Sequence, residues 1–277
     1  MITNDVREPA VAGTFYEREP KKLKSEIIKF FEEVKPPEIN GTVIGIASPH
    51  AGYFYSGKTA AYGYKLLQGL SYETVIVISP SHYEYFDGVS IYNGRAYMTP
   101  FGLIEIDNEL RDALAENKKI ISVSGKGHGR EHALEVQLPF LQSVLKDFKL
   151  LPIVIGNQSE EVCRTLSEIL AEEIAGKSVL LVASSDLSHY HSHDIADSLD
   201  SKIHRHIENY DYESIMEDME NEKVEACGGG PIVTVMQTAK LLGADKSKIL
   251  YRCDSSEASG DFRQVVGYLS AVFYKEN

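Results

Sequence analysis

Three short runs of apolar residues, rich in valine and isoleucine, each end abruptly in small residues and a histidine. The runs are VIGIASPH (43–50), VIVISPSH (75–82) and SVLLVASSDLSH (178–189), which end in His50, His82 and His189. Continuous apolar runs are typical of strands buried on both faces of an α/β sheet. Ligands of open α/β sheets bind in the crevice beyond the carboxyl ends of the strands. We therefore predict that the three histidines, together with Asp186, converge at one end of a single sheet.

Helical patterns alternate with these runs and with further apolar runs at 149–155 and 265–273. The helical patterns cover residues 20–37, 56–68, 131–146 and 159–175, and residues 88–106 are interpreted as a hairpin insert. No linker-like stretch divides the chain. The sequence thus predicts one α/β domain over residues 1–277, with a mostly parallel or mixed sheet covered by helices on both faces.

The composition excludes several classes of partner. The 277 residues include 28 Lys and Arg against 41 Asp and Glu, a formal net charge of −13. An acidic chain of this kind is a poor partner for nucleic acid or for an anionic membrane. The N-terminus lacks the pattern of a signal peptide, and no uncharged apolar run is long enough to span a bilayer. We expect a cytoplasmic protein that has neither nucleic acid nor a membrane as a partner.

The three cysteines are Cys163, Cys227 and Cys253, and they are too far apart to form a CxxC pair. Neither a disulfide framework nor a cysteine-rich zinc module is therefore predicted. Cys227 precedes three glycines and Pro231, which we expect to open a helix at its first position. A thiol near a helix N-terminus has a lowered pKa and can serve as a thiolate ligand or nucleophile. The alternative is that Cys227 is a small buried residue in a tight turn.

Several residues at the strand ends are candidate metal ligands. His50 and His82 supply two imidazoles, and with a carboxylate they would resemble the facial site of non-haem iron enzymes. Asp186 is the candidate for that carboxylate. Cys227 competes with it for the third position.

The segment HGREH (128–132) matches a zinc-protease pattern, but glycines crowd its start. We interpret it as a loop that enters a helix, on which His132 and Glu135 share a face because they lie three residues apart. His132 is predicted to border the pocket and to hydrogen bond a ligand or Asp186. The alternative is that His132 caps the helix.

Motifs along nearly the whole chain resemble the Memo family. They are REPAVAGTFY (7–16), PHAGYFYSG (49–57), SPSH (79–82), EHALEVQLPFL (131–141), SSDLSHY (184–190), CGGGP (227–231) and SGDFRQVVGY (259–268). Memo proteins are similar in fold to class III extradiol ring-cleaving dioxygenases, which bind non-haem iron. The resemblance implies that His50 and His82 are metal ligands. It places Cys227 at the position of the third metal ligand, where those dioxygenases carry a glutamate.

The resemblance also implies that His189 is an acid–base histidine, with Asp186 and His132 in the same pocket. Two imidazoles and a thiolate favour copper or zinc, with iron as a further possibility. Two function classes follow. One is a metal-dependent, dioxygenase-like oxidoreductase that acts on a small molecule, and the other is a non-catalytic module that binds a peptide or handles copper. Prokaryotic relatives further imply a functional link to radical SAM and AMMECR-type proteins.

Overall fold

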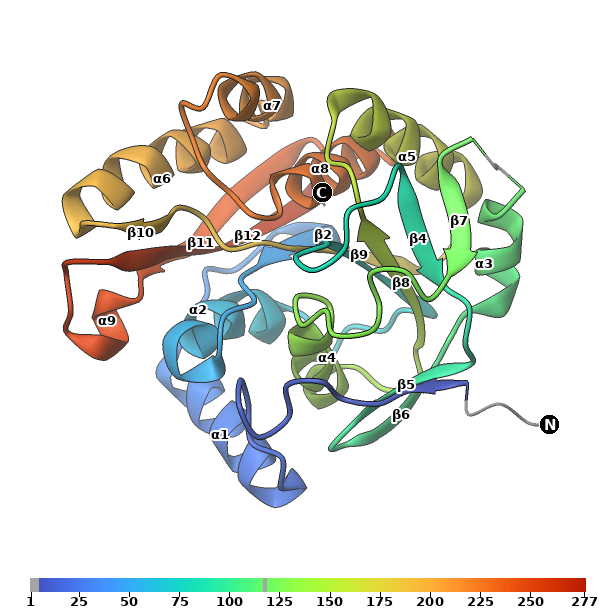
Figure 1. The fold of residues 1–277 in the computed structure, drawn as a ribbon, viewed down its shortest axis with the longest axis horizontal. Helices are drawn as coiled ribbons and strands as arrows, with labels where there is room; N and C mark the ends of the chain where they lie inside the picture. Colours follow the sequence, from blue (N-terminus) through green and yellow to red (C-terminus); the bar gives the residue numbers. More distant parts are fainter. Residues whose placement is uncertain (1–4, 117–118) are drawn as a thin grey trace.

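The structure, a computed structural model, describes residues 5–116 and 119–277. Within these residues nine strands form one large mixed sheet, and three short strands form a small sheet (Figure 1). The small sheet consists of β1 (Val6–Arg7), β5 (Ala96–Thr99) and β6 (Gly102–Glu105). The large sheet runs in the spatial order β10 (His189–His191), β12 (Val265–Glu276), β2 (Gly41–Ser48), β9 (Val179–Ser184), β3 (Thr74–Pro80), β8 (Lys149–Ile155), β4 (Val89–Tyr92) and β7 (Ile121–Ser124), and β11 (Lys246–Asp254) also pairs with β12.

The centre of the large sheet is parallel. β2 pairs with β9, β9 with β3, and β3 with β8, all in parallel register. Parallel strands bring their carboxyl ends to the same edge, so the segments that follow β2, β3 and β9 meet there. The antiparallel neighbours β12 and β4 flank this centre on its two sides and make the sheet mixed.

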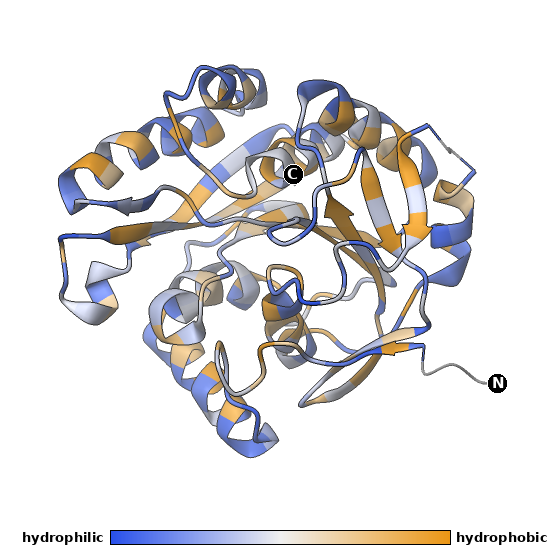
Figure 2. Ribbon diagram, in the orientation of Figure 1, coloured by the Kyte–Doolittle hydropathy of each residue, from blue (hydrophilic) through white to orange (hydrophobic). Residues whose placement is uncertain are grey.

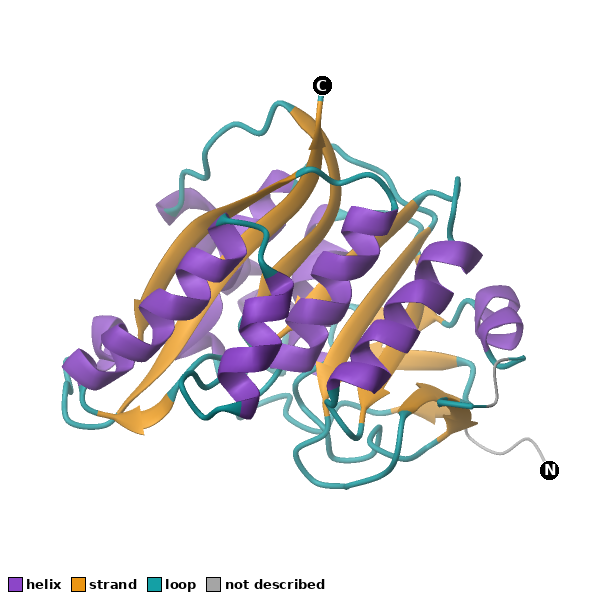
Figure 3. Cartoon of the chain, turned by 90° about the horizontal axis from the view of Figure 1, so that it is seen from above, coloured by secondary structure: helices purple, strands orange, loops and turns teal. Residues whose placement is uncertain are grey.

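Helices cover both faces of the large sheet, as Figures 1 and 3 show. Side chains alternate between the faces of a strand, so Val75 and Val77 of β3 pack into one apolar cluster and Ile76 and Ile78 into another. The helices of the first cluster are α1 (Pro20–Glu33), α2 (Tyr53–Leu66), η1 (Glu135–Gln137) and α4 (Leu138–Val144). The helices of the second are α3 (Asn108–Leu114), α5 (Glu160–Glu173), α6 (His193–Glu208), α7 (Tyr212–Glu220) and α8 (Gly229–Leu241).

The predicted fold class is confirmed. The central strands are mostly hydrophobic, whereas the helices around them carry both hydrophilic and hydrophobic residues, as expected for a sheet covered on both faces (Figure 2). Among the described helices, none combines the length and the apolar character that crossing a membrane requires. The prediction of one domain over 1–277 includes residues 1–4 and 117–118, which lie outside the described residues.

Two local predictions are wrong in part. The helix predicted over 131–146 begins at Glu135, because the Glu131 carboxylate accepts hydrogen bonds from the backbone nitrogens of His132 and Ala133 and holds them in a turn. The insert predicted over 88–106 is divided. Its first strand, β4, joins the large sheet, and only β5 and β6 form a separate hairpin.

Candidate metal centre

The histidines that end the apolar runs meet at one edge of the sheet. His50 follows β2, His82 follows β3, and both Asp186 and His189 follow β9. All four line one cavity of about 660 Å³. The predicted convergence is confirmed, and its cause is the parallel pairing of three strands that are far apart in the sequence.

His50 is buried and is oriented by a hydrogen-bond chain beneath the cavity. Its Nδ1 lies 2.9 Å from Oγ of Ser184, whose hydroxyl donates to the carbonyl oxygen of Ala133 at 2.6 Å. Because the single hydroxyl hydrogen is used in that bond, Nδ1 of His50 must be the donor to Ser184. Gln137 donates to the same Oγ at 2.8 Å. The lone pair of His50 is therefore on Nε2.

His82 is oriented by Glu131. Nδ1 of His82 lies 2.9 Å from Oε1 of Glu131, and the backbone nitrogen of His82 donates to Oε2 at 2.6 Å. An ionised carboxylate only accepts hydrogen bonds, so Nδ1 donates and Nε2 is left for another ligand. Carboxylate–histidine pairs of this kind commonly orient histidines that bind metals.

His132 completes a compact group with the other two histidines. Its ring centroid lies 4.9 Å from that of His82 and 5.5 Å from that of His50. One ligand atom from each of the three residues can be chosen so that all lie within 4.8 Å of one another. Nδ1 of His132 is buried and has no hydrogen-bond partner among the described residues. This nitrogen lies 3.4 Å from Oε1 of Glu131. Three converging imidazoles fit a transition metal ion, so this cluster could hold one.

Cys227 contacts His50 and the backbone of Asp186. Its Sγ is 3.1 Å from Nε2 of His50 and accepts a hydrogen bond from the backbone nitrogen of Asp186 at 3.2 Å. Burial and the neighbouring Asp186 carboxylate raise the pKa of the Cys227 thiol. The expectation of a lowered pKa near a helix N-terminus is wrong, because burial disfavours the charged thiolate. The assignment of Cys227 as a ligand stays a prediction.

The glycines after Cys227 allow the chain to pass close to β9. A Cβ on Gly228 would lie 2.2 Å from the carbonyl oxygen of Ser184. The side-chain amide of Gln158 holds the turn from outside, donating to the carbonyl oxygen of Cys227 and accepting from the nitrogen of Gly230, both at 2.8 Å. Helix α8 begins at Gly229, not at Pro231 as predicted, so the proline occupies its third position.

Burial shifts the charge states around the cavity. It raises the pKa of Asp186 to about 7, and it lowers the pKa of His50 well below its ordinary value, with His82, His132 and His189 adding to the effect. The contact of 3.9 Å between Nε2 of His50 and Oδ2 of Asp186 therefore joins groups that favour their neutral forms. Burial also opposes the charge on His82, but the hydrogen bond and charge of Glu131 raise its pKa. A carboxyl and an imidazole with raised pKa values are suited to proton transfer.

His189 reaches the cavity from a distorted strand. The register of β10 against β12 shifts between His189 and His191, and the intervening Tyr190 has a positive φ of 62°. A bulge of this kind redirects the side chains next to it. Burial lowers the pKa of His189. The lining of the cavity also includes the aromatic residues Phe15, Tyr55, Tyr190 and Tyr268.

The sequence analysis did not identify Glu131, Gln137 and Ser184 as the supports of the two histidines. A signal was available in EHALEVQLPFL (131–141), where two glutamates, a histidine and a glutamine stand among apolar residues. Glu131, Glu135 and Gln137 are all buried. Buried polar side chains need partners, so this pattern predicts a hydrogen-bond network.

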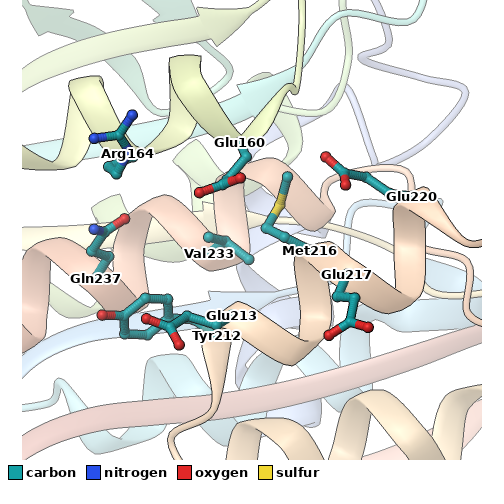
Figure 4. A pocket seen from close by; sticks show the side chains of 9 residues that line it. All are labelled: Glu160, Arg164, Tyr212, Glu213, Met216, Glu217, Glu220, Val233 and Gln237. Atoms are coloured by element: carbon teal, nitrogen blue, oxygen red, sulfur yellow. The ribbon is translucent and has the colours of Figure 1, made fainter.

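A second cavity, of about 360 Å³, lies between α5, α7 and α8 (Figure 4). Its lining includes the four glutamates Glu160, Glu213, Glu217 and Glu220 together with Arg164. None of the described residues that line it is a histidine or a cysteine. It is therefore separate from the candidate metal centre.

Comparison with known proteins agrees with the resemblance seen in the sequence. The family model described as Memo-like protein matches residues 7–272. A MEMO1 family protein of Methanosarcina barkeri is 38% identical over 270 residues, covering 96% of this chain and 99% of the relative. A MEMO1 family protein of Nitrosopumilus maritimus is 35% identical over 273 residues, covering 97% and 99%.

An uncharacterized protein of Escherichia coli K12 has a similar solved structure. Its TM-score is 0.53 at 12% identity, and the alignment covers 83% of this chain and 99% of the other. At this identity the likeness concerns the fold alone. The family model and the relatives together span nearly all of the sequence, and we conclude that the chain belongs to the Memo family.

Proposed function

We propose that the protein binds one transition metal ion in the cleft at the carboxyl ends of β2, β3 and β9. Nε2 of His50 and Nε2 of His82 bind the ion. The observation that carries the proposal is that Ser184 and Glu131 engage Nδ1 of these two histidines, so that only the Nε2 atoms can bind an ion, and that Nε2 of His50 already contacts the Sγ atom of Cys227.

We assign the third ligand to Cys227. Its Sγ is 3.1 Å from Nε2 of His50, so the two atoms are close enough that both would hold the same ion. The ion would displace the thiol proton, since metal binding requires the thiolate. A thiolate beside two imidazoles favours copper or zinc over iron. His132 is the competing third ligand, because its ring completes the compact group of imidazoles.

Anaerobic titration of Zn(II), Cu(I) and Fe(II) into the wild type, Cys227→Ser and His132→Ala tests this assignment. We expect Cys227→Ser to weaken copper and zinc binding more than His132→Ala does. Co(II) adds a spectroscopic test, since a thiolate ligand gives a near-ultraviolet charge-transfer band that three imidazoles do not give. A band that persists unchanged in Cys227→Ser would refute the thiolate assignment.

For the activity, we propose a metal-dependent oxidoreductase that acts on a small molecule in the cleft. The bound metal would supply Lewis-acid or redox chemistry. Asp186, with a pKa of about 7, can hold or release a proton beside His50 near neutral pH. His189 lies at the wall of the cavity and can exchange protons with a ligand there, and His132 lines the same space. Oxygen consumption by the metal-loaded protein with a panel of phenols tests the activity, with His189→Gln as the comparison.

The second candidate is a non-catalytic module that uses the cleft for a peptide or for copper handling. The observation that favours it is that two tyrosines of the cavity wall are exposed, Tyr55 at 44% and Tyr190 at 71%. Tight Cu(I) binding without oxygen consumption would support this candidate over the oxidoreductase. The link to radical SAM and AMMECR-type proteins that the family resemblance implies is a separate proposal, which co-purification from the native cell would test.

A further inference from the structure

The N-terminal segment (residues 6–16) is joined to the candidate metal centre by a buried ion pair. Arg7, in β1, and Glu135, in η1, form this pair, and both side chains are almost completely buried. A buried ion pair is a weak source of stability, because the cost of removing both charges from water offsets their attraction. The contacts that surround this pair indicate another role.

The Arg7 guanidinium contacts one short stretch of chain at three points. Its Nε donates to the carbonyl oxygen of His128 at 2.9 Å, and its Nη2 donates to that of Glu131 at 2.5 Å. Its Nη1 pairs with the Glu135 carboxylate. The planar fork of donors in arginine suits such a set of fixed acceptors. Arg7 thereby holds the segment 128–135, which carries Glu131 and His132.

Glu135 holds the N-terminal segment in return. Its carboxylate accepts hydrogen bonds from the backbone nitrogens of Ala10 at 2.8 Å and Val11 at 3.0 Å. It also accepts one from the hydroxyl of Tyr16 at 2.6 Å. The two segments are therefore clamped together by side chains on both sides. Phe15, which belongs to this N-terminal segment, packs against His132, with the two ring centroids 4.8 Å apart. Phe15 also lines the cavity.

The clamped stretch supports both histidines of the centre. Glu131 orients His82 through Nδ1, and Gln137, two residues after Glu135, donates to the Ser184 hydroxyl that orients His50. A displacement of segment 128–135 would shift Glu131 and His132 together. The Arg7–Glu135 ion pair is thus connected to His82 through Glu131 and does not itself contact His82.

We propose that Arg7 is a positioning residue for the metal centre. Together with Glu135 it sets the position of Glu131 and His132, so that His82 and His132 face the ion. This inference rests on the proposed metal site. The role differs from general stabilisation, because it predicts an effect on His82 that an equal loss of stability elsewhere does not produce.

Arg7→Lys is the test variant, since it keeps the positive charge near Glu135 and loses the fork that reaches His128 and Glu131. Leu166→Ala is the control, because Leu166 is buried in the apolar cluster on the other face of the sheet. Two quantities are measured in each folded protein. One is the dissociation constant for Zn(II), from competition with a chromophoric chelator. The other is the hydrogen-bonded Nδ1–H resonance of His82 in the metal-free protein.

We expect Arg7→Lys to weaken Zn(II) binding by about 10- to 100-fold and to lose the His82 resonance, as for other disrupted supports of ligands. Leu166→Ala should keep both. Unchanged affinity together with a retained resonance in Arg7→Lys would overturn the inference. If the wild type binds no Zn(II), the proposed function fails, and the His82 resonance alone then decides whether Arg7 positions this loop. If Arg7→Lys does not fold, the Nδ1–H resonance of His82 is measured in Arg7→Gln instead.

Discussion

The carboxylate of Glu131 accepts two hydrogen bonds from His82. Its Oε1 lies 2.9 Å from Nδ1, and its Oε2 lies 2.6 Å from the backbone nitrogen. The same carboxylate accepts from the backbone of His132 and Ala133, so one side chain orients a candidate ligand and shapes the turn that carries another. A role of this kind predicts effects of substitution at residues that never touch the metal.

Glu131→Gln should weaken Zn(II) affinity by about 10- to 100-fold, because an amide cannot accept hydrogen bonds from His82 with both of its polar atoms. Isothermal titration of the purified variant measures this. The matched control is Asp218→Asn, which breaks a histidine–carboxylate contact of 2.9 Å to His206 elsewhere on the protein. Equal affinity in wild type and Glu131→Gln would mean that His82 does not need its carboxylate partner.

Ser184→Ala removes the acceptor for Nδ1 of His50 and the partner of Gln137. A buried donor without a partner costs about 1–3 kcal/mol, so the free energy of unfolding should fall by that order. Metal affinity should fall as well, since His50 loses the bond that selects its tautomer. Urea unfolding and Zn(II) titration measure the two effects.

Ser167→Ala is the control for this prediction. Its buried hydroxyl bonds only backbone carbonyl oxygens of Cys163 and Thr234 among the described residues, away from the cleft. It should lower stability by a similar amount and leave the metal affinity unchanged. A loss of metal affinity in both variants would point to a global effect of destabilisation.

Gly228→Ala should displace the turn that carries Cys227, because the added Cβ would lie 2.2 Å from the carbonyl oxygen of Ser184. Backbone must move to remove such a contact, and we expect a lower melting temperature together with loss of any Co(II)–thiolate band. Gly125→Ala is the comparison, since its nearest contact would be an ordinary 3.9 Å to Asn93. If both variants melt alike and keep the band, close approach at Gly228 is not required.

Asp200 should make stability depend on pH without involving the metal centre. Burial raises its pKa from the ordinary value of 3.8 to about 6. The folded protein then binds more protons at Asp200 than the unfolded chain does between about pH 4 and 6, so stability falls as pH rises through that window. The difference of about two units corresponds to at most about 3 kcal/mol at 1.36 kcal/mol per unit.

Asp200→Asn removes this charge and keeps an oxygen that can accept from the backbone nitrogen of Ser188. We expect the variant to be more stable than the wild type at pH 8 and the difference to shrink towards pH 4. Urea unfolding across this range measures it. A difference that does not vary with pH would show that Asp200 is ionised throughout.

Much of the site follows from the order of residues along the chain. Each apolar run is long enough for one strand and ends in a polar residue, so the position of His50, His82, Asp186 and His189 at strand ends is a local property. The parallel arrangement of buried strands then requires their carboxyl ends to meet. This reasoning predicted the fold class and the cavity without any contact between distant residues being known.

The supports of the site depend on contacts that no local pattern encodes. Glu131 is 49 residues from His82, Gln137 is 47 from Ser184, and Arg7 is 128 from Glu135. The error over residues 131–134 has the same origin, since the helical pattern there is overridden by hydrogen bonds to the Glu131 carboxylate. Propensity is a weak preference, and a buried carboxylate that needs donors outweighs it.

The sequence by itself determined the strand ends at which the histidines lie and, through its motifs, the family. The tertiary structure decided which nitrogen of each histidine is left for a ligand, and it placed His132 beside the pair while Cys227 contacts His50 alone among the three. The physical reason is that a hydrogen bond is short and directional, so the packing of the whole chain determines which groups can form one. The burial of an apolar strand is not directional, and any apolar neighbour can provide it.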